Sequence, residues 1–332
     1  MRDPIALHKQ GTKQLRASVV VPAYNEELNV EAFYERILAV LDDTFAGWEI
    51  VFVDDGSRDR TATLLRKLNS ADPRVKVVTL TRNFGSHVAI SAGLDHVRNE
   101  IVVVLACDLQ DPPELIPELL NRWEEGHEIV WATRAEREDS LVRRGTAKIF
   151  YALVRRFAIP DYPSTGTGSF CLLDSAVVEA VRRFPERNRT TFGLVSWTGF
   201  SQAETPYTRE ARHAGTSKWS RRQLIKAAID TFISFSSTPI RFISYCGIFV
   251  SIGGFLLALW VIISRILFGT QLRGWASLMT TILIIGGLQL LTVGILGEYL
   301  ARIGEDSRRR PLYLVRETLG MDDEPGRIRE SG

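Results

Sequence analysis

The stretch Val102–Glu114 (V-V-V-L-A-C-D-L-Q-D-P-P-E) joins an apolar run directly to an acidic cluster. The run from Ile101 to Leu105 consists of β-branched and aliphatic residues, which is typical of a strand buried on both faces of a parallel sheet. Ligands bind at the carboxyl ends of the strands in open α/β sheets, and the acidic cluster follows this strand directly. The stretch therefore predicts an α/β fold with a binding site at this point.

Asp108 and Gln110 are the candidate metal ligands of this cluster. In extended backbone, residues two apart point to the same side, and carboxylate and amide oxygens are hard ligands that suit Mg²⁺ or Mn²⁺. An alternative that fits Asp108 equally well is an ordinary turn aspartate. Asp111, with Pro112 at the first helical position and Glu114 three residues on, has the pattern of a helix N-cap.

The chain before this stretch alternates between strand-like and helix-like segments. Apolar residues recur at helical spacing from Val30 to Leu41, and shorter helices are expected at Thr61–Leu68 and about Val88–Val97. Strands are expected at Ala17–Ala23, Glu49–Val53, Arg74–Leu80, Ile101–Leu105 and Glu128–Thr133. This alternation predicts a mostly parallel, Rossmann-like sheet with helices on both faces.

Two adjacent carboxylates, Asp54 and Asp55, follow the second expected strand. An Asp-Gly turn with Gly56 explains one of them. The other is placed to accept hydrogen bonds from a nucleobase or ribose, as acidic residues after a strand do in dinucleotide folds. The chain has neither G-x-x-x-x-G-K-[ST] nor G-x-G-x-x-G at a strand–helix junction, so a metal on Asp108 is the expected phosphate-binding element.

Two long uncharged runs decide the class of protein. The 332 residues have a net charge of +2 and are 45% apolar, which argues against a disordered or nucleic-acid-binding chain. Phe242–Ser264 and Trp275–Gly297 are each 23 residues long, about 35 Å as helices, against a hydrocarbon core of about 30 Å. We therefore expect two transmembrane helices. Two buried helices of a soluble domain are the alternative.

The charges around these runs predict their orientation. Between the runs there are only two basic residues, Arg265 and Arg273. Outside them lie Arg221, Arg222, Lys226, Arg241, Arg302, Arg308, Arg309 and Arg310. The first sixteen residues contain no apolar region, so no cleaved signal peptide is expected. We therefore expect an integral protein of the cell (inner) membrane, with the catalytic domain and both termini in the cytoplasm. Three unpaired cysteines fit this reducing compartment.

The region between the sheet and the apolar runs contains basic and loop-like segments. Residues 141–157 are amphipathic and basic, which favours a solvated helix face over a helix at the membrane surface. Residues 160–169 predict a flexible loop near the site. Residues 209–222 are either a juxtamembrane basic cluster or a phosphate clamp. The expected parts are a polar tail (1–16), a cytoplasmic sheet domain (17–220), an amphipathic juxtamembrane helix (221–238), a two-helix transmembrane hairpin (239–300) and a cytoplasmic C-terminal tail (301–332).

Five motifs, in this order, resemble the membrane-bound family 2 glycosyltransferases of the polyisoprenyl-phosphate type, relatives of dolichol-phosphate mannosyltransferase. They are V-P-A-Y-N-E (21–26), V-D-D-G-S (53–57), R-N-F-G (82–85), D-L-Q-D-P-P-E (108–114) and R-x-x-G-x-S-K-W (212–219). A single motif is weak, but five with this spacing are specific and cover nearly the whole chain. The resemblance implies a GT-A fold, whose sheet binds a nucleotide-diphosphate sugar.

The resemblance also implies roles for individual residues. The implied nucleotide-sugar-binding residues are Pro22, Tyr24, Glu26, Asp54, Asp55, Ala106, Cys107, Asp108 and Arg134. The implied metal ligands for Mg²⁺ or Mn²⁺ are Asp108 and Gln110, and the implied acceptor- and phosphate-binding residues are Arg212, Ser217 and Lys218. Asp108, Arg212 and Lys218 are the implied catalytic residues.

Two positions depart from the family pattern. Ala106 stands at the first acidic position of D-x-D, so Gln110, water and the diphosphate would complete the coordination of the metal. Ser169 stands where many relatives carry the Asp of a G-D-F segment, so no role of that Asp carries over.

The implied reaction is an inverting, metal-dependent transfer of a sugar from a UDP- or GDP-linked donor to undecaprenyl or dolichyl phosphate. It would take place on the cytoplasmic face of the membrane, in cell-envelope glycosylation. A homo-oligomer is left open as a further partner, and no nucleic acid is expected. One alternative is a processive polysaccharide synthase, although the chain lacks its Q-x-x-R-W motif and extra spans. The other is a non-catalytic nucleotide-sugar-binding membrane scaffold, which Ala106 keeps open.

Overall fold

The computed structural model describes residues 15–134, 167–186, 190–210, 238–268 and 274–321, with isolated residues at 152, 154–157, 159, 162 and 163. The chain divides into two compact units. The first comprises Met1–Gln223 and Pro311–Gly332, and the second comprises Leu224–Arg310. The first unit is therefore built from two separate pieces of the sequence, one on each side of the second unit.

A mixed, mostly parallel sheet of eight strands forms the first unit, in the order β7-β5-β6-β4-β1-β2-β3-β8. The strands are β1 (Arg16–Ala23), β2 (Gly47–Asp54), β3 (Val75–Leu80), β4 (Ile101–Val104), β5 (Ile129–Arg134), β6 (Thr167–Asp174), β7 (Gln202–Tyr207) and β8 (Val315–Leu319). Strands β4, β1, β2 and β3 pair in parallel, and β5 pairs in parallel with β7. The five strands expected from the sequence are confirmed, as is the GT-A type of fold.

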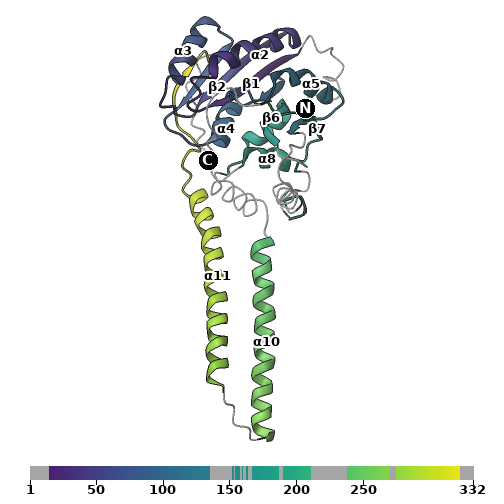
Figure 1. Ribbon diagram of the computed structural model, residues 1–332, viewed down its shortest axis with the longest axis vertical. Coiled ribbons are helices and arrows are strands. Elements are labelled where there is room, and N and C mark those ends of the chain that lie inside the picture. Colours follow the sequence, from purple (N-terminus) through teal and green to yellow (C-terminus); the bar gives the residue numbers. More distant parts are fainter. Residues whose placement is uncertain are drawn as a thin grey trace. The chain divides into compact units, whose positions relative to one another are not determined.

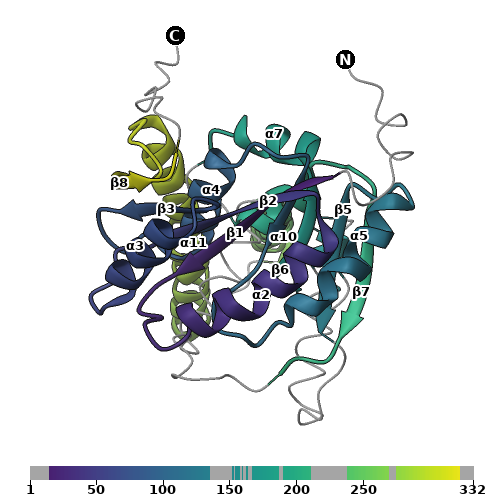
Figure 2. The same ribbon diagram turned by 90° about the horizontal axis from the view of Figure 1, so that it is seen from above.

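Helices cover both faces of this sheet (Figures 1 and 2). They are α2 (Val30–Thr44), α3 (Thr61–Ala71), α4 (Ser86–His96), the short 3₁₀ helix η2 (Pro113–Leu115), α5 (Ile116–Glu124), α7 (Ser175–Arg182) and α8 (Thr191–Trp197). Alternate residues of β2 face opposite sides: Phe52 packs with α2, α3 and α5, whereas Val53 packs with α4, α7 and α8. On α2, the helical spacing buries Val30, Phe33 and Ile37 completely.

Three strands were not expected from the sequence. Strand β6 inserts between β4 and β5 and pairs antiparallel with both. The expectation of a flexible loop at 160–169 is therefore wrong for Thr167–Ser169, which belong to β6. Strand β8 lies within the expected C-terminal tail, pairs antiparallel with β3 and forms one edge of the sheet. Strand β7 pairs in parallel with β5 and forms the other edge. The pairing partners of these strands are distant in sequence, so no local pattern identifies them.

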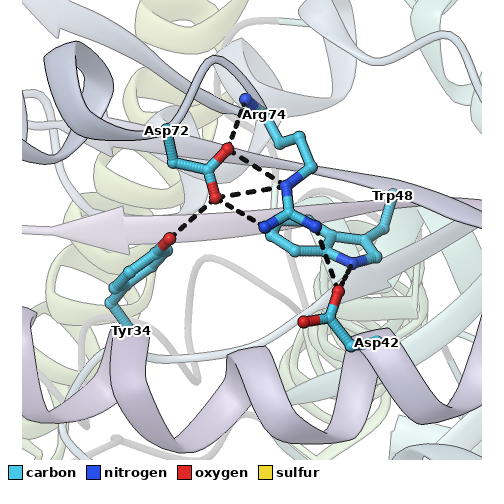
Figure 3. Close-up of polar contacts among 5 residues, drawn as sticks. All are labelled: Tyr34, Asp42, Trp48, Asp72 and Arg74. Atoms are coloured by element: carbon cyan, nitrogen blue, oxygen red, sulfur yellow. Dashed lines mark hydrogen bonds and ion pairs between the residues drawn. The ribbon is translucent and has the colours of Figure 1, made fainter.

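A polar cluster joins α2 to the amino ends of strands β2 and β3 (Figure 3). It therefore lies at the opposite ends of these strands from their carboxyl ends. Asp72 accepts hydrogen bonds from the Tyr34 hydroxyl (2.7 Å) and the Arg74 guanidinium. Asp42 accepts from the indole nitrogen of Trp48 (2.8 Å) and from Arg74 (3.0 Å). The guanidinium of Arg74 also stacks on Trp48, 3.8 Å from the ring centroid. The cluster holds α2 against the sheet at a place remote from the candidate site.

The second unit contains two long helices, α10 (Thr238–Phe268) and α11 (Trp275–Ser307). Each contains a 22-residue segment, Ile243–Ser264 and Thr280–Ala301, that is long and apolar enough to cross a membrane, with mean hydropathy 2.5 and 1.9. Large apolar side chains such as Phe249 and Leu290 are exposed on them. Helix α11 continues seven residues past the expected boundary at 300. Residues 221–237 of the expected juxtamembrane helix (221–238) and most of the basic segment 141–157 lie outside the described residues, and Thr238 is the first residue of α10.

Candidate active site

The candidate site lies where the parallel strands end. The register aligns Ala23 of β1 with Asp54 of β2, and Asp54 with Thr79 of β3. On the other side of β1, Val20 is level with Val104, the last residue of β4. The loops that follow these strands carry four of the five sequence motifs, and they emerge at one edge of the sheet, as expected for parallel strands.

The loop after β1 is bonded to the loop after β2. Asn25 has a left-handed backbone (φ 52°), its amide donates to the Ser57 hydroxyl (2.9 Å), and its side-chain oxygen accepts from the amide of Arg58 (2.8 Å). The amide of Glu26 donates to the Thr61 hydroxyl (2.8 Å). These contacts fix the backbone of the loop that carries Tyr24 and Glu26, directly after Pro22 near the end of β1. All three are half-buried.

The two adjacent aspartates have different structural roles. Asp54 accepts a hydrogen bond from the amide of Ser57 (3.0 Å), which makes it the turn aspartate of the pair. Asp55 accepts from the amides of Phe84 (2.7 Å) and Gly85 (2.9 Å), at the amino end of α4. Burial raises the pKa of Asp55 to about 6, although the two amide hydrogen bonds oppose the shift. Sequence reasoning did not find this second role, the anchoring of the R-N-F-G motif.

Gly56 allows the R-N-F-G loop to lie directly against the turn after β2. Its φ is +67°, and an added Cβ would stand 2.5 Å from the carbonyl carbon of Arg82 and 2.9 Å from the amide nitrogen of Asn83. A side chain at this position would therefore push the two loops apart. The motifs V-P-A-Y-N-E, V-D-D-G-S and R-N-F-G consequently form one connected structure.

The D-L-Q-D loop is a turn and not the extended segment that the sequence suggested. Strand β4 ends at Val104, Leu109 has a left-handed backbone (φ 58°), and Oδ1 of Asp108 accepts from the amide of Gln110 (3.2 Å). The expectation that extended backbone points the Asp108 and Gln110 side chains to one side is therefore wrong. Cys107 and Asp108 are buried and Ala106 is half-buried.

Asp111 is not the helix cap that its neighbours in the sequence suggested. Pro112 precedes η2, and no side chain caps that helix. Asp111 is instead buried, and its Oδ1 accepts from the Tyr207 hydroxyl and from Nε of Arg209 (3.3 Å). Its Oδ2 is buried and has no hydrogen-bond partner among the described residues. The partners that displaced the capping role come from β7 and the residues after it, about a hundred positions along the chain.

The segment after β7 lies along the D-L-Q-D loop. Nη2 of Arg209 stands 3.8 Å from Oδ2 of Asp108, and the amide of Glu210 donates to the carbonyl of Gln110 (3.0 Å). Arg36 of α2 binds both Glu114 and Glu210 through paired hydrogen bonds of 2.7–2.9 Å. These contacts position the start of the basic segment, although the acceptor residues expected there, Arg212, Ser217 and Lys218, lie outside the described residues.

Arg134 joins the same cluster from the end of β5. It is level with Tyr207 in the β5–β7 ladder, and its charge acts on the Tyr207 side chain. Burial and the nearby Asp111 raise the pKa of Tyr207, and Arg134 opposes that rise. Nε of Arg134 is buried and has no hydrogen-bond partner in the part of the chain that the structure describes. The expected donor-side arginine is therefore level with Tyr207, whose hydroxyl bonds to Asp111 of the D-L-Q-D loop.

The donor set around Asp108 fits a divalent ion that keeps some of its own water. No group of three or more His, Cys, Asp or Glu side chains that could bind a metal is found within the described ranges. The loop offers the carboxylate of Asp108 and the side-chain amide of Gln110 as oxygen ligands, and in the same loop Oδ2 of Asp111 is buried without a hydrogen-bond partner among the described residues. Mg²⁺ is bound by one or two carboxylates together with water and substrate phosphates, which matches this small set of oxygen ligands.

Comparisons with known proteins give consistent matches. The model of the family "Glycosyl transferase family 2" matches residues 18–182. A Bacillus subtilis (strain 168) protein, uncharacterized glycosyltransferase YkcC, is 39% identical over 313 residues, which are 94% of this chain and 97% of that protein. The bactoprenol glucosyl transferase of Shigella phage SfV is 39% identical over 303 residues, 91% of this chain and 98% of that protein. The solved structure of mannosyltransferase PcManGT from Pyrobaculum calidifontis, with GDP-Man and Mn²⁺, matches with a TM-score of 0.49 and 16% identity, over 92% of this chain and 94% of that one.

Proposed function

The chain belongs to glycosyltransferase family 2, and from this premise we propose that it transfers a sugar from a nucleotide-diphosphate sugar to a polyisoprenyl phosphate. The observation that carries the proposal is the convergence of the three bonded motif loops and the D-L-Q-D loop at one edge of the sheet. The name of the phage relative, which states bactoprenol and a glucosyl group, supports a polyprenyl lipid as the acceptor.

The membrane is the second part of the proposal. Helices α10 and α11 expose apolar side chains along segments long enough to span a bilayer, and a lipid acceptor would be found there. The basic residues outside the two helices support a cytoplasmic location for the sheet unit and both termini. The proposed divisions of the chain are the cytoplasmic sheet domain, the juxtamembrane segment and the two-helix hairpin.

The donor would occupy the edge where the motif loops meet. Pro22, Tyr24, Glu26, Asp54 and Asp55 would bind the nucleoside, and Ala106 and Cys107 would line the site beside them. Asp108 and Gln110 would hold Mg²⁺ or Mn²⁺, and Arg134 would face the diphosphate. When bound, the metal would neutralise negative charge on the leaving diphosphate. A carboxylate and a side-chain amide are oxygen donors of the kind that Mg²⁺ and Mn²⁺ take, which supports this assignment.

The acceptor needs little activation by the protein. A phosphate monoester has a second pKa near 6, so it is largely ionised at neutral pH. The protein must then hold the two substrates in line and neutralise their charge, which is the role proposed for Arg212, Ser217 and Lys218. A single displacement of this kind inverts the configuration at the sugar carbon.

The test is a panel of UDP- and GDP-linked sugars incubated with the purified protein, Mg²⁺ or Mn²⁺ and a short polyprenyl phosphate, with products read by mass spectrometry. We expect one donor to give a polyprenyl-phosphate sugar. Products longer than one sugar would favour a processive synthase, and binding of a donor without any product would favour a scaffold.

Asp108→Asn is the matching variant, because it preserves shape and removes the one carboxylate of the D-x-D pattern. We expect transfer to fall by about a hundredfold or more, with an unchanged melting temperature. Asp43→Asn, an exposed change on α2, is the control and should retain full activity. Near-normal activity of Asp108→Asn would refute the metal assignment.

A further inference from the structure

Arg209 lies between two carboxylates of the D-L-Q-D loop. Its Nη2 is 3.8 Å from Oδ2 of Asp108, and its Nε is 3.3 Å from Oδ1 of Asp111. The guanidinium is mostly buried, with 19% of its side chain exposed, and the Asp108 and Asp111 side chains are 9% and 0% exposed. A cation therefore already occupies one side of the carboxylate that is proposed to bind the metal. Water screens such a pair less than it screens a surface ion pair.

The two contacts of Arg209 differ in strength. The contact with Asp111 is within hydrogen-bond distance, and the Tyr207 hydroxyl fixes the same carboxylate oxygen from the neighbouring strand β7. The contact with Asp108 is an ion pair at 3.8 Å without a hydrogen bond. Arg209 is thus held by its hydrogen bond to Asp111 and makes only a longer ion pair with Asp108. The weaker contact is the one that an incoming divalent ion would replace.

We propose that Arg209 is a built-in competitor for the metal at Asp108, and that Asp111 is the positioning residue that limits this competition. The inference rests on the proposed function, because it assumes that Asp108 binds a divalent ion. Before the donor binds, Arg209 partly neutralises Asp108 and lowers its affinity for the metal. When Asp108 binds the metal, Arg209 stays on Asp111, beside the site, where its charge can serve the donor diphosphate.

This arrangement favours arrival of the metal together with its nucleotide. The chain has only one D-x-D carboxylate, since Ala106 replaces the other. A single, partly neutralised carboxylate binds a bare ion weakly, and the diphosphate supplies the missing negative charge. Arg209 therefore acts in opposite directions in two measurements, because it weakens metal binding to the free protein and assists transfer.

The experiment titrates the full-length protein in detergent with Mn²⁺ alone, following free Mn²⁺ by electron paramagnetic resonance, and measures transfer separately at saturating Mn²⁺. For Arg209→Gln we expect Mn²⁺ affinity to rise about two- to fivefold, the factor that about 0.4–1 kcal/mol represents. Transfer should fall about tenfold or more, because a phosphate-facing charge is lost. Arg66→Gln, which removes an exposed arginine paired with Glu317, is the control and should change neither quantity.

Asp111→Asn tests the positioning role with the opposite sign. Without the Asp111 charge, Arg209 should pair more fully with Asp108, so Mn²⁺ affinity should fall about two- to fivefold. In the double variant with Arg209→Gln, Asp111→Asn should have no effect on metal affinity. If Asp111→Asn still lowers the affinity of the double variant, Asp111 is itself a metal ligand and the positioning role is refuted.

The remaining outcomes also decide the proposal. An unchanged or lower Mn²⁺ affinity in folded Arg209→Gln protein overturns the competition. A normal sugar transfer by the wild type, with no Mn²⁺ binding to any variant, overturns both the competition and the metal assignment but leaves the transfer itself intact. Because the two single variants are tested separately and in opposite directions, loss of folding in one leaves the other decisive.

Discussion

Asp55 shows, at the scale of single residues, how this site combines structure with recognition. Its carboxylate binds the two amides at the start of α4 while it lies beside Asp54, in a place where water is largely excluded. Burial therefore disfavours the charged carboxylate and raises its pKa, although the two hydrogen bonds favour the charged form. The residue fastens the R-N-F-G loop to the V-D-D-G-S loop, so the nucleoside-binding surface proposed for this edge depends on an internal contact.

Asp55 should also make stability depend on pH. Its pKa is about 6 in the folded protein against 3.8 ordinarily, so between these values the folded state holds more protons than the unfolded state. Stability should then fall as pH rises through this range. Asp55→Asn removes this contribution to the pH dependence of unfolding. The difference in unfolding free energy between variant and wild type should therefore shift in favour of the variant by about 1–3 kcal/mol as pH rises from about 4 to about 7. Unfolding measured by tryptophan fluorescence across this range tests it. Parallel curves for the two proteins would contradict it.

The basic segment offers a second prediction for individual residues. If Arg212 and Lys218 clamp phosphate, replacing either with Ala should lower transfer about a hundredfold or more, because the contacts are made in a partly desolvated site. Arg221→Ala and Arg222→Ala are the matched controls and should stay within a few-fold, since a lipid-surface contact contributes only about 1 kcal/mol. Initial rates for all four variants decide the matter. Equal, small effects would reduce the segment to a membrane-surface patch.

At the scale of elements, the two ends of the parallel strands have different tasks. The carboxyl ends support loops that are bonded to one another and present carboxylates. The amino ends are closed by the cluster of Figure 3, in which Arg74 bonds to Asp72 and Asp42 and stacks on Trp48. Burial and the hydrogen bond to Asp72 raise the pKa of Tyr34 to about 12, so its hydroxyl stays a donor across the physiological range.

The cluster predicts a measurable contribution to stability. Arg74→Ala removes two ion pairs and a cation–π contact, so we expect a loss of about 1–2 kcal/mol in the free energy of unfolding. Arg66→Ala, which removes a single ion pair between α3 and β8, should cost about 0.5 kcal/mol or less. Chemical unfolding of both variants gives the comparison. Sugar transfer by Arg74→Ala should remain normal, because the cluster lies at the opposite edge of the sheet.

At the scale of the whole molecule, the chain leaves the sheet unit for the two long helices and then returns to it. Strand β8 pairs with β3 and continues the sheet by one strand, and the amide of Thr81 donates to the carbonyl of Leu314. A protein that ended before the helices would therefore lose an edge strand and expose the backbone of β3. The sheet unit and the helical hairpin are linked twice by the chain.

The membrane topology gives the prediction for the whole molecule. In a Cys246→Ser background, a cysteine at Thr270 should react with a membrane-impermeant maleimide added to intact cells, because the segment between the helices carries few basic residues. A cysteine at Ser307 should react only after the membrane is opened. Cys107 and Cys171 are buried and should not contribute to the labelling. The reverse pattern would overturn the proposed orientation.

Features that depend on local periodicity and composition could be predicted from the amino-acid sequence. The spacing of Val30, Phe33 and Ile37 defines the buried side of α2, and uninterrupted apolar runs define β4 and the two long helices. The motif order identified the family, which the comparisons confirm. These features are local because each follows from residues within a few turns or strand lengths of one another.

Contacts between groups that are distant in the sequence could not be predicted in this way. The local pattern favoured a helix cap at Asp111, yet two side chains about a hundred residues away, Tyr207 and Arg209, bond to its carboxylate. Strands β6 and β8 exist because β4, β5 and β3 offer unpaired edges to them. The left-handed turn at Leu109 likewise replaces the extended geometry expected there. A buried carboxylate or an open strand edge must find a partner, and the three-dimensional packing of the chain, not its order, decides which partner is within reach.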